Sequence, residues 1–420
     1  MPGPTADPDG AQSTAADPSA ATLAPPGPAT TVVLGGLVAL GPLTIDLYLP
    51  ALPGLTGDLH STAPAAQLTL TGSLLGLALG QLLFGPLSDR LGRRRPLLVG
   101  MVVYTLATVV CALADSMPLL IAGRVLQGSA GAAGLVIARA IARDRYAGVA
   151  LIRFLASLGV ISGLAPILAP VLGAQLLRYT DWRGTFVALA SLGALLTVSA
   201  AVVLRESLPP ERRHRDGLAS TARAIGSLLR DSRFLGYVLT SSFAFGALFA
   251  YVGGSSVVLQ TVYAISPQSF SLVFAVNSVA VVVFTQINGR VLVQRLPGRT
   301  LMTVGLLTAA TAGALVIVFT TVWDLGLAGV WPALFLLMAS MGILLPNSSA
   351  EALTMAPHAA GSASALLGTG TFLCGSVVAP LSSLGGHPSA TALGAVVLSC
   401  ALLASAAFTL LCRPWTTKPA

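Results

Sequence analysis

Long apolar runs, separated by short polar connections, fill most of this chain. A helical run of about 20 apolar residues crosses a hydrocarbon layer of roughly 30 Å. Backbone polar groups must be satisfied internally in such a layer, which favours helices over open sheets. We therefore expect an all-α integral membrane protein with twelve transmembrane helices, at residues 31–52, 67–87, 96–114, 119–141, 151–176, 183–204, 235–258, 269–289, 300–320, 327–348, 361–382 and 391–412.

Polar segments divide the chain. Residues 1–29 are rich in Ala, Pro, Asp, Ser and Thr and contain no Lys or Arg, which predicts a disordered cytoplasmic tail without a signal peptide. A polar inter-bundle loop at 206–233 separates an N-terminal six-helix bundle, residues 30–205, from a C-terminal one, residues 234–412. Residues 413–420 form a short second tail.

Composition and charge fit this pattern. The mean hydropathy is +0.84 and only 9% of residues are charged, too few to cover a soluble protein of this size. If connections alternate between two sides, twenty of the 23 basic residues collect on one side. By the positive-inside rule that side is cytoplasmic, and so are both termini. Because this segregation explains the net charge of +8, we expect no nucleic-acid partner.

Several classes of chemistry are absent from the sequence. The four Cys and four His residues show no metal-ligand spacing, so no metal site is predicted. No phosphate-binding GxxxxGK[ST] motif occurs, which argues against ATP-driven transport. We expect a protein that is not an enzyme and has no cofactor, and that uses an ion gradient or merely equilibrates its substrate.

The sequence GPLSDRLGRRRPL, residues 85–97, places one Asp and four Arg residues between the second and third apolar runs. Because charge is costly inside a bilayer, we expect a short water-facing loop whose Gly85 and Gly92 allow close backbone approach. It resembles the signature of the major facilitator superfamily, which implies a fold of two six-helix bundles and a gating role for this loop. The matching residues are Gly85, Asp89, Arg90, Gly92, Arg93, Arg94 and Arg95.

Asp46 is the one acidic residue of fifteen that falls inside a predicted span. At about 1.5 Å per residue from Thr31, it lies roughly 22 Å from the cytoplasmic end. Burial favours its neutral form, and a carboxyl group poised between two forms can carry a proton. The alternative is a structural Asp that caps a turn near Pro50 and Pro53.

Arg124 is the one basic residue buried in a span, away from its ends, at a depth similar to that of Asp46. We expect the two to lie close enough to interact, with Arg124 favouring the charged form of Asp46 until the bundle rearranges. Arg124, Gln127 and Gly128 also resemble the superfamily's fourth-span motif, which implies a proton-relay role. The alternative is a structural anchor that hydrogen-bonds unwound carbonyl groups.

The fifth span combines helix-packing glycines with helix-bending prolines. It resembles, imperfectly, the antiporter motif of drug-exporting members, although general small-residue packing would give a similar pattern. The residues are Gly159, Gly163, Pro166, Pro170 and Gly173.

Three runs together resemble the Bcr/CflA branch of bacterial drug:proton antiporters, at residues 44–50, 80–90 and 163–170. This resemblance implies a multi-pass protein of the bacterial cell (inner) membrane that exports small amphipathic drugs of the chloramphenicol or bicyclomycin type. Its partners would be the drug, protons and the lipid bilayer, and we expect a monomer. A proton-coupled transporter of a nutrient or sugar and a non-transporting membrane receptor remain alternatives.

Polar and aromatic residues within the spans are candidates to line a substrate cavity, although most such aromatic residues simply pack or meet lipid. The candidates are Tyr48, Phe243, Phe245, Tyr251, Asn277, Gln286 and Asn347.

Overall fold

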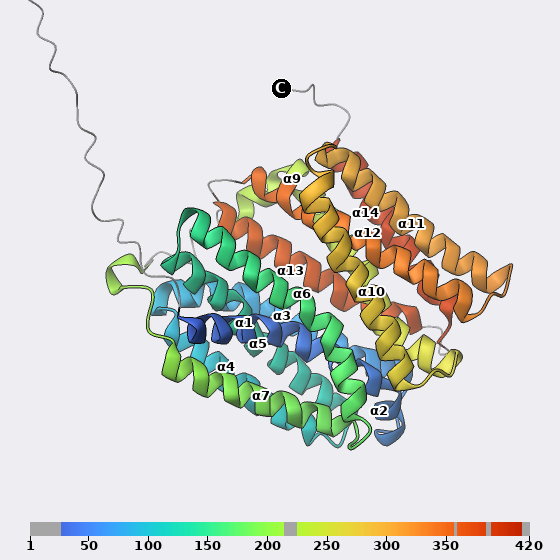
Figure 1. The fold of residues 1–420 in the computed structure, drawn as a ribbon, viewed down its shortest axis with the longest axis horizontal. Helices are drawn as coiled ribbons and strands as arrows, with labels where there is room; N and C mark the ends of the chain where they lie inside the picture. Colours follow the sequence, from blue (N-terminus) through green and yellow to red (C-terminus); the bar gives the residue numbers. More distant parts are fainter. Residues whose placement is uncertain (1–26, 214–224, 357–358, 384–387, 414–420) are drawn as a thin grey trace, which may run out of the picture.

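The computed structural model describes residues 27–213, 225–356, 359–383 and 388–413, which form helices and connecting turns without a strand. The first six-helix half contains α1 (Pro28–Asp46), α2 (Leu52–Asp58), α3 (Ala63–Leu91), α4 (Arg94–Ala112), α5 (Met117–Arg145), α6 (Gly148–Leu176) and α7 (Trp182–Val203). The second half contains α9 (Ser232–Val257), α10 (Pro267–Ile287), α11 (Gly298–Thr321), α12 (Leu327–Thr354), α13 (Ala360–Val378) and α14 (Ala390–Ala407). Figure 1 shows the first half in blue to green and the second in yellow to red.

Twelve segments of the described chain are long and apolar enough to cross a membrane, and each overlaps one predicted span. The all-α prediction is therefore confirmed. Several helices continue past the apolar run that marks them in the sequence; α3 and α5 each have 29 residues. The predicted tails lie largely outside the described residues, and α1 begins at Pro28.

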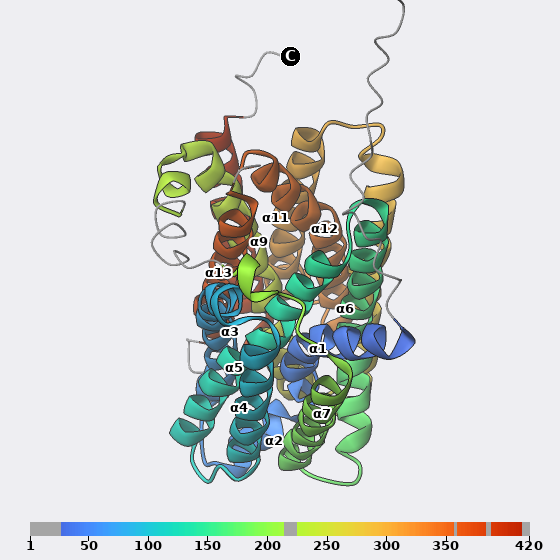
Figure 2. The same cartoon turned by 90° about the vertical axis from the view of Figure 1, so that its left-hand side faces the viewer.

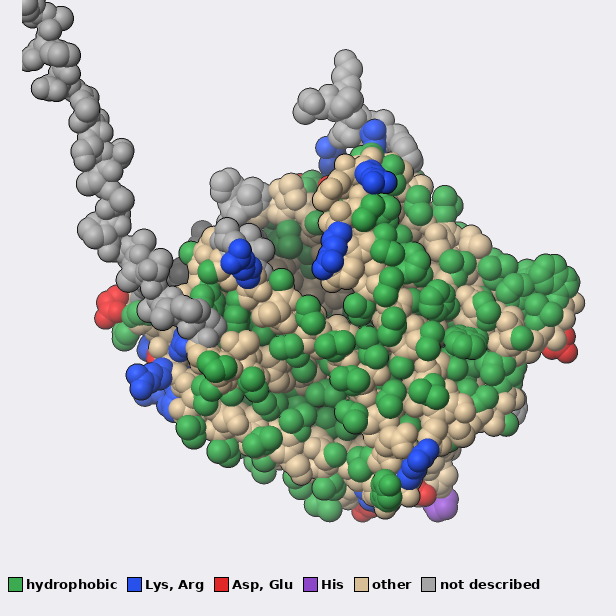
Figure 3. Space-filling model, viewed as in Figure 1, with side chains coloured by type: hydrophobic (Ala, Val, Ile, Leu, Met, Phe, Trp, Pro, Cys, Tyr) green, Lys and Arg blue, Asp and Glu red, His purple; other side chains and the backbone are tan. Residues whose placement is uncertain are grey.

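The outer surface is apolar, as a lipid-facing surface must be. On α6 a stripe of exposed side chains recurs every four residues, at Val160, Leu164, Leu168 and Leu172. Figure 3 shows hydrophobic side chains over most of one face, with charged side chains near its margins. These exposed apolar helices explain how a chain with so little charge remains folded in a bilayer.

Small residues bring α3 and α5 into close contact in the first half. A Cβ atom built on Gly76 would overlap the Val125 carbonyl oxygen of α5, and one on Gly80 would overlap that of Ser129. In return, Gly128 of α5 lies directly against the backbone of Ser73. This interface resembles the small-residue packing of membrane helices and fixes α5 against α3, whose last turn contains Asp89.

The two halves meet through α3 with α13 and α6 with α10 (Figures 1 and 2). Hydrogen bonds cross between them from Gln67 to Gly253 O, at 3.2 Å, and from Thr71 to Ser376 O, at 2.7 Å. Both donors lie in the first third of α3, away from the α3–α4 connection. We call the end with the α3–α4, α5–α6 and α10–α11 connections the basic end, because its arginines include Arg93, Arg145 and Arg295. The hydrogen bonds between the halves therefore lie toward the other end.

Candidate functional site

The first span is broken directly after its only carboxylate. α1 ends at Asp46, and a short turn, η1 (Leu49–Ala51), leads into α2. Pro50 and Pro53 explain the break, since neither has an N–H to donate to the carbonyl four residues earlier. We call residues 47–51 the α1 break. Asp46 is only 6% exposed and forms no ion pair with a described residue.

Side chains from both halves bind the backbone around the α1 break. The guanidinium group of Arg124 on α5 donates to Thr44 O at 3.0 Å, and the Ser256 hydroxyl on α9 donates to Leu49 O at 2.5 Å. Carbonyl groups that a continuous helix would satisfy internally are thus satisfied by two other helices. A movement of one half against the other must therefore act on the backbone beside Asp46.

Arg124 is completely buried in a polar network of the first half. Its Nη1 also donates to Gln127 Oε1 at 2.7 Å, and Gln127 Nε2 donates to Thr108 Oγ1 at 2.8 Å. The guanidinium carbon lies 4.3 Å from the ring centre of Tyr48 and 5.5 Å from that of Phe186. Hydrogen bonds and cation–π contacts offset part of the cost of burying this charge, although Nη2 has no partner.

No ion pair joins Arg124 to Asp46 among the described residues, so their conformation-dependent interaction stays a prediction. Arg124 binds the carbonyl of Thr44, two residues before Asp46. The alternative, a structural anchor on backbone carbonyls, describes the observed contact.

A polar chain of the second half is centred on Tyr251 of α9. The Tyr251 hydroxyl accepts a hydrogen bond from Asn277 Nδ2 at 3.0 Å. Asn277 Oδ1 in turn accepts from Trp331 Nε1 at 3.2 Å. Tyr251 stacks on Phe274, with ring centres 5.3 Å apart. Three helices of the second half, α9, α10 and α12, thus contribute hydrogen-bonding groups to this chain.

The gating loop is shorter than the sequence predicts. Asp89 belongs to the last turn of α3, and Arg93 directly precedes α4. Gly92 turns the chain with a φ of 89°, a backbone conformation that favours glycine. Gly85 has no atom within 4 Å of a built Cβ, so the predicted close approach is wrong there. Arg93 forms ion pairs with Asp89 and with Asp144 of α5, the latter at 2.9 Å.

Glu206, just after α7, binds the gating loop and was missed in the sequence. Its carboxylate accepts from the backbone N–H groups of Arg93, at 2.8 Å, Arg94, at 3.2 Å, and Ser207 and Leu208, both at 3.1 Å. Burial raises the pKa of this carboxyl, but the four hydrogen bonds outweigh it and hold the pKa below its ordinary value. Glu206 thus serves as the N-terminal cap of α4.

The other arginines of the gating loop also stay within the first half. Arg94 donates to Leu204 O at 2.9 Å and to Ala201 O at 2.7 Å, while Arg90 and Arg95 are exposed. The role of this loop in closing a gate remains a prediction.

The antiporter motif of α6 contacts both the α1 break and the second half. A Cβ atom on Gly173 would overlap Leu47 O, so α6 depends on glycine there. A Cβ atom built on Gly163 would lie 3.5 Å from Val282 of α10, an ordinary contact distance, and one built on Gly159 would have no atom within 4 Å. A neighbouring helix therefore packs beside Gly163 but not beside Gly159. Of the two prolines, Pro166 accepts through its carbonyl oxygen from Ser278 at 3.5 Å, and Pro170 is buried.

The structure brings together two of the cavity candidates, Tyr251 and Asn277, and separates the rest. The Tyr48 hydroxyl bonds Thr69 inside the first half. Asn347 donates to Asn288 Oδ1 at 2.9 Å, and Phe245 packs on Phe249 and Phe372. Phe243 is half-buried and Gln286 is exposed. Trp331 was missed, although it is the one Trp of four that falls inside a predicted span.

Within the described ranges, no group of three or more His, Cys, Asp or Glu side chains is arranged to hold a metal ion. The functional chemistry of this site is therefore that of a lone buried carboxylate, a buried guanidinium group and the hydrogen-bonding side chains around them.

Comparison with known proteins decides the family. The model of the Major Facilitator Superfamily matches residues 34–380. The chain belongs to this superfamily. It is 39% identical over 386 residues to an uncharacterized MFS-type transporter, YdgK, of Bacillus subtilis, covering 90% of this chain and 94% of that protein. It is 30% identical to a bicyclomycin resistance protein homolog of Haemophilus influenzae, covering 83% and 87%.

A solved structure supports the fold. A bacterial homolog of the human lysosomal transporter Spinster, described as inward-facing and unoccupied, matches with a TM-score of 0.71 at 18% identity, over 94% of this chain and 99% of that one. The predicted place in the Bcr/CflA-like branch of the superfamily is confirmed by the drug-resistance relatives. As a superfamily member, the chain is a multi-pass membrane transporter, not an enzyme, and such transporters use ion gradients and no cofactor.

Proposed function

We propose that this transporter is a proton-coupled antiporter that exports small amphipathic drugs from the cytoplasm by alternating access. The observation that carries the proposal is Asp46, a buried carboxylate without an ion-pair partner at a break that both halves bind. The name of the bicyclomycin resistance homolog supports a drug as the exported substrate.

The position of Asp46 supports coupling of its proton to movement. An ionised carboxylate in a low-dielectric interior is unfavourable unless water or a cation reaches it, so Asp46 loses its proton only when the surroundings open. Opening separates the first half from Ser256 of the second, whose hydroxyl binds Leu49 O in the α1 break. Proton loss and the change of access thereby favour each other.

The arginine distribution gives the orientation in this proposal. With the basic end in the cytoplasm, the hydrogen bonds between the halves close the outer side, and the drug enters from the cytoplasm. The transporter would lie as a monomer in the inner membrane of a bacterium. The gating loop, which includes Asp89 and Arg93, would contact the second half when the basic end closes.

Proton movement in inside-out vesicles tests the proposal. Wild-type vesicles are energised, and a pH-sensitive dye reports the lumen while chloramphenicol, bicyclomycin or a cationic drug is added. We expect each transported drug to release protons from the wild-type lumen, and Asp46→Asn to abolish that release because the amide cannot carry a proton. The matched control is Asp324→Asn, an exposed Asp whose φ of 43° an Asn adopts easily.

Three outcomes decide the proposal. Release that Asp46→Asn abolishes and Asp324→Asn preserves supports it. Equal release in all three proteins would assign the proton to another group, and drug uptake without proton release would remove the coupling altogether.

A further inference from the structure

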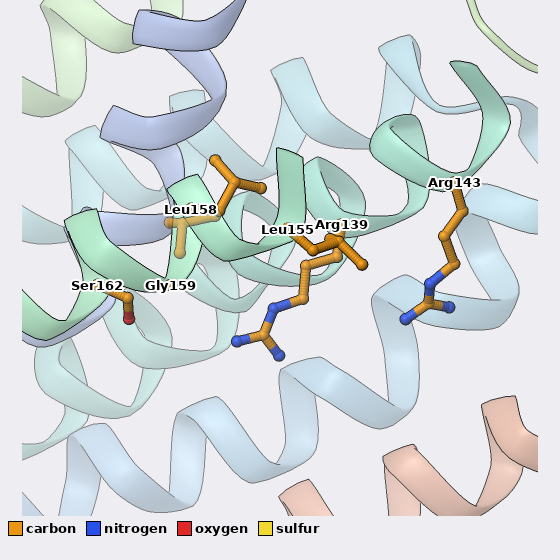
Figure 4. Close-up of a pocket in the computed structure, with 7 residues that line it drawn as sticks. Arg139, Arg143, Leu155, Leu158, Gly159 and Ser162 are labelled. Atoms are coloured by element: carbon orange, nitrogen blue, oxygen red, sulfur yellow. The ribbon is translucent and has the colours of Figure 1, made fainter. Parts of the chain in front are cut away.

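A cavity of about 210 Å³ lies between α1, α5 and α6 in the first half. Its lining combines two arginines of α5 with an apolar wall: Val38, Arg139, Arg143, Leu155, Leu158, Gly159 and Ser162. Figure 4 shows the guanidinium groups of Arg139 and Arg143 projecting into one open region beside α6, with the Ser162 hydroxyl nearby. Arg139 lies six residues before the end of α5, and both Arg139 and Arg143 are exposed, so the cavity opens to the surface.

The two arginines have no counter-charge among the described residues. Neither forms an ion pair or a hydrogen bond there, and no carboxylate lines the cavity. Asp144, the neighbouring acid in the sequence, is held by Arg93 and by the Ser207 hydroxyl at 2.8 Å. The positive charges of Arg139 and Arg143 also repel each other. Two like charges that face one cavity without a counter-ion create a positive potential inside it.

The remaining lining limits what can bind. Leu155, Leu158 and Val38 offer an apolar wall that suits an aromatic or aliphatic body, while Ser162 can donate a hydrogen bond. At about 210 Å³, the cavity is below the range of roughly 300 to 1,000 Å³ typical of drug-sized ligands. It therefore fits a small aromatic acid or the acidic end of a larger molecule.

We propose that this cavity binds the anionic group, a carboxylate or phosphate, of a transported substrate, with Arg139 and Arg143 as the recognising residues. Arginine suits this role because its planar guanidinium group donates paired hydrogen bonds to either anion. The proposal rests on the proposed export function and extends it: exported drugs include amphipathic anions, which are drawn from the basic end before they reach Asp46. A phosphate on a lipid headgroup has the same chemistry, so the test separates the two sources.

Equilibrium dialysis of the full-length transporter in phosphatidylcholine nanodiscs, with labelled salicylate and its neutral counterpart salicylamide, tests the proposal. Arg139→Gln and Arg143→Gln should each raise the Kd of salicylate at least tenfold, equivalent to about 1.4 kcal/mol. The Kd of salicylamide should change less than about threefold, because the lost interaction is with charge. Arg299→Gln, which removes an exposed arginine of the second half, should change neither Kd.

A second variant tests the cavity without changing charge. Gly159→Leu places a side chain where no atom lies within 4 Å of a built Cβ, so it should fold normally and fill the cavity. It should weaken salicylate and salicylamide together. A normal unfolding temperature of each variant excludes a folding defect.

Several results would overturn the proposal: no salicylate binding by the wild type, equal binding by wild type and the Arg139→Gln/Arg143→Gln double variant, or an equal loss in Arg299→Gln. Loss of wild-type binding in phosphatidylglycerol nanodiscs would assign the arginines to a lipid phosphate and overturn a substrate role. Because this readout involves no proton, salicylate binding without drug-triggered proton release would leave the site intact and reject the antiport mechanism. Proton release with neutral drugs but no salicylate binding would support the antiport mechanism and reject the anion site.

Discussion

Arg124 holds a buried positive charge that the described carboxylates do not neutralise. Its partners are neutral: the carbonyl of Thr44, the amide of Gln127 and the ring of Tyr48. Neutral partners keep the arginine in place while the nearby carboxylate gains and loses its proton. A permanent ion pair would instead hold Asp46 in the charged form.

Replacing Arg124 by Lys should therefore impair the transporter even though charge is kept. A single ammonium cannot reach Thr44 O and Gln127 together or lie flat on the Tyr48 ring. We expect a loss of about 1.5 to 3 kcal/mol of stability, the contribution of a hydrogen bond to a charged group, and at least a tenfold lower export rate. Thermal unfolding in detergent and drug efflux from cells measure the two effects.

The exposed Arg178 provides the control, since Arg178→Lys should leave both quantities unchanged. Wild-type stability and export in Arg124→Lys would show that charge alone matters at this position.

Gly173 is the second residue at which a single atom should matter. A methyl group there would overlap Leu47 O, so Gly173→Ala must move α6 away from the α1 break. Overpacking of this kind costs about 1 to 3 kcal/mol, and we expect a lower unfolding temperature and slower export. Gly57→Ala is the matched control, because nothing lies within 4 Å of a Cβ built there. Equal unfolding temperatures of the two variants would contradict the contact.

The sequence predicted these residues better than their contacts. A lone Asp and a lone Arg can be recognised in apolar runs because charge there is rare. Counting residues along each span then gave their similar depth. Counting does not give the direction around the helix axis, which depends on how six helices pack. The contact of Arg124 with the backbone carbonyl of Thr44 was therefore not predicted as such.

At the scale of elements, the N-terminus of α4 depends on a cap from a distant part of the chain. Glu206 accepts from the N–H groups of Arg93 and Arg94, where the helix dipole favours a negative charge. Because Glu206 is largely exposed, we expect Glu206→Gln to cost only about 0.5 to 1 kcal/mol at neutral pH.

The effect of Glu206→Gln should also depend on pH. The pKa of Glu206 is lower in the folded protein than the ordinary value of 4.5, so its ionised form stabilises the fold above pH 4.5. That contribution disappears as the pH falls through the lowered pKa. The difference in unfolding temperature between wild type and variant should thus be constant from pH 8 to pH 5 and shrink below pH 4.5. A difference that persists in acid would exclude the charge as its cause.

The elements themselves follow from hydropathy, since each described span overlaps a predicted one. Their ends do not, because helix formation continues into polar residues wherever the backbone can stay hydrogen-bonded. Asp89 and Arg90 were assigned to a loop and instead complete α3, leaving Gly92 and Arg93 as the turn. The cap by Glu206 joins positions more than 110 residues apart, which no local pattern reveals.

For the whole molecule, the contacts between halves define the current state. α3 binds α13 and α9 near the end opposite the basic end, where Gln67 and Thr71 donate to backbone carbonyl groups of the second half. The ion pairs of Arg93 remain within the first half. Figure 3 shows a hollow on one face with arginine side chains beside it. An alternating mechanism requires the contacts of α3 with the second half to break whenever the other end closes.

A cross-link across these contacts should therefore stop transport. Thr71 Oγ1 lies 2.7 Å from Ser376 O, so cysteines at positions 71 and 376 are close enough for a short thiol cross-linker. We expect cross-linking to hold the halves together and to lower drug export to background, with recovery when a cleavable linker is reduced. The native Cys111, Cys400 and Cys412 are buried, and each single-cysteine variant treated in the same way controls for reaction elsewhere. Efficient cross-linking with undiminished export would mean that these helices never separate, and would reject movement of the two halves at this end as a step of transport.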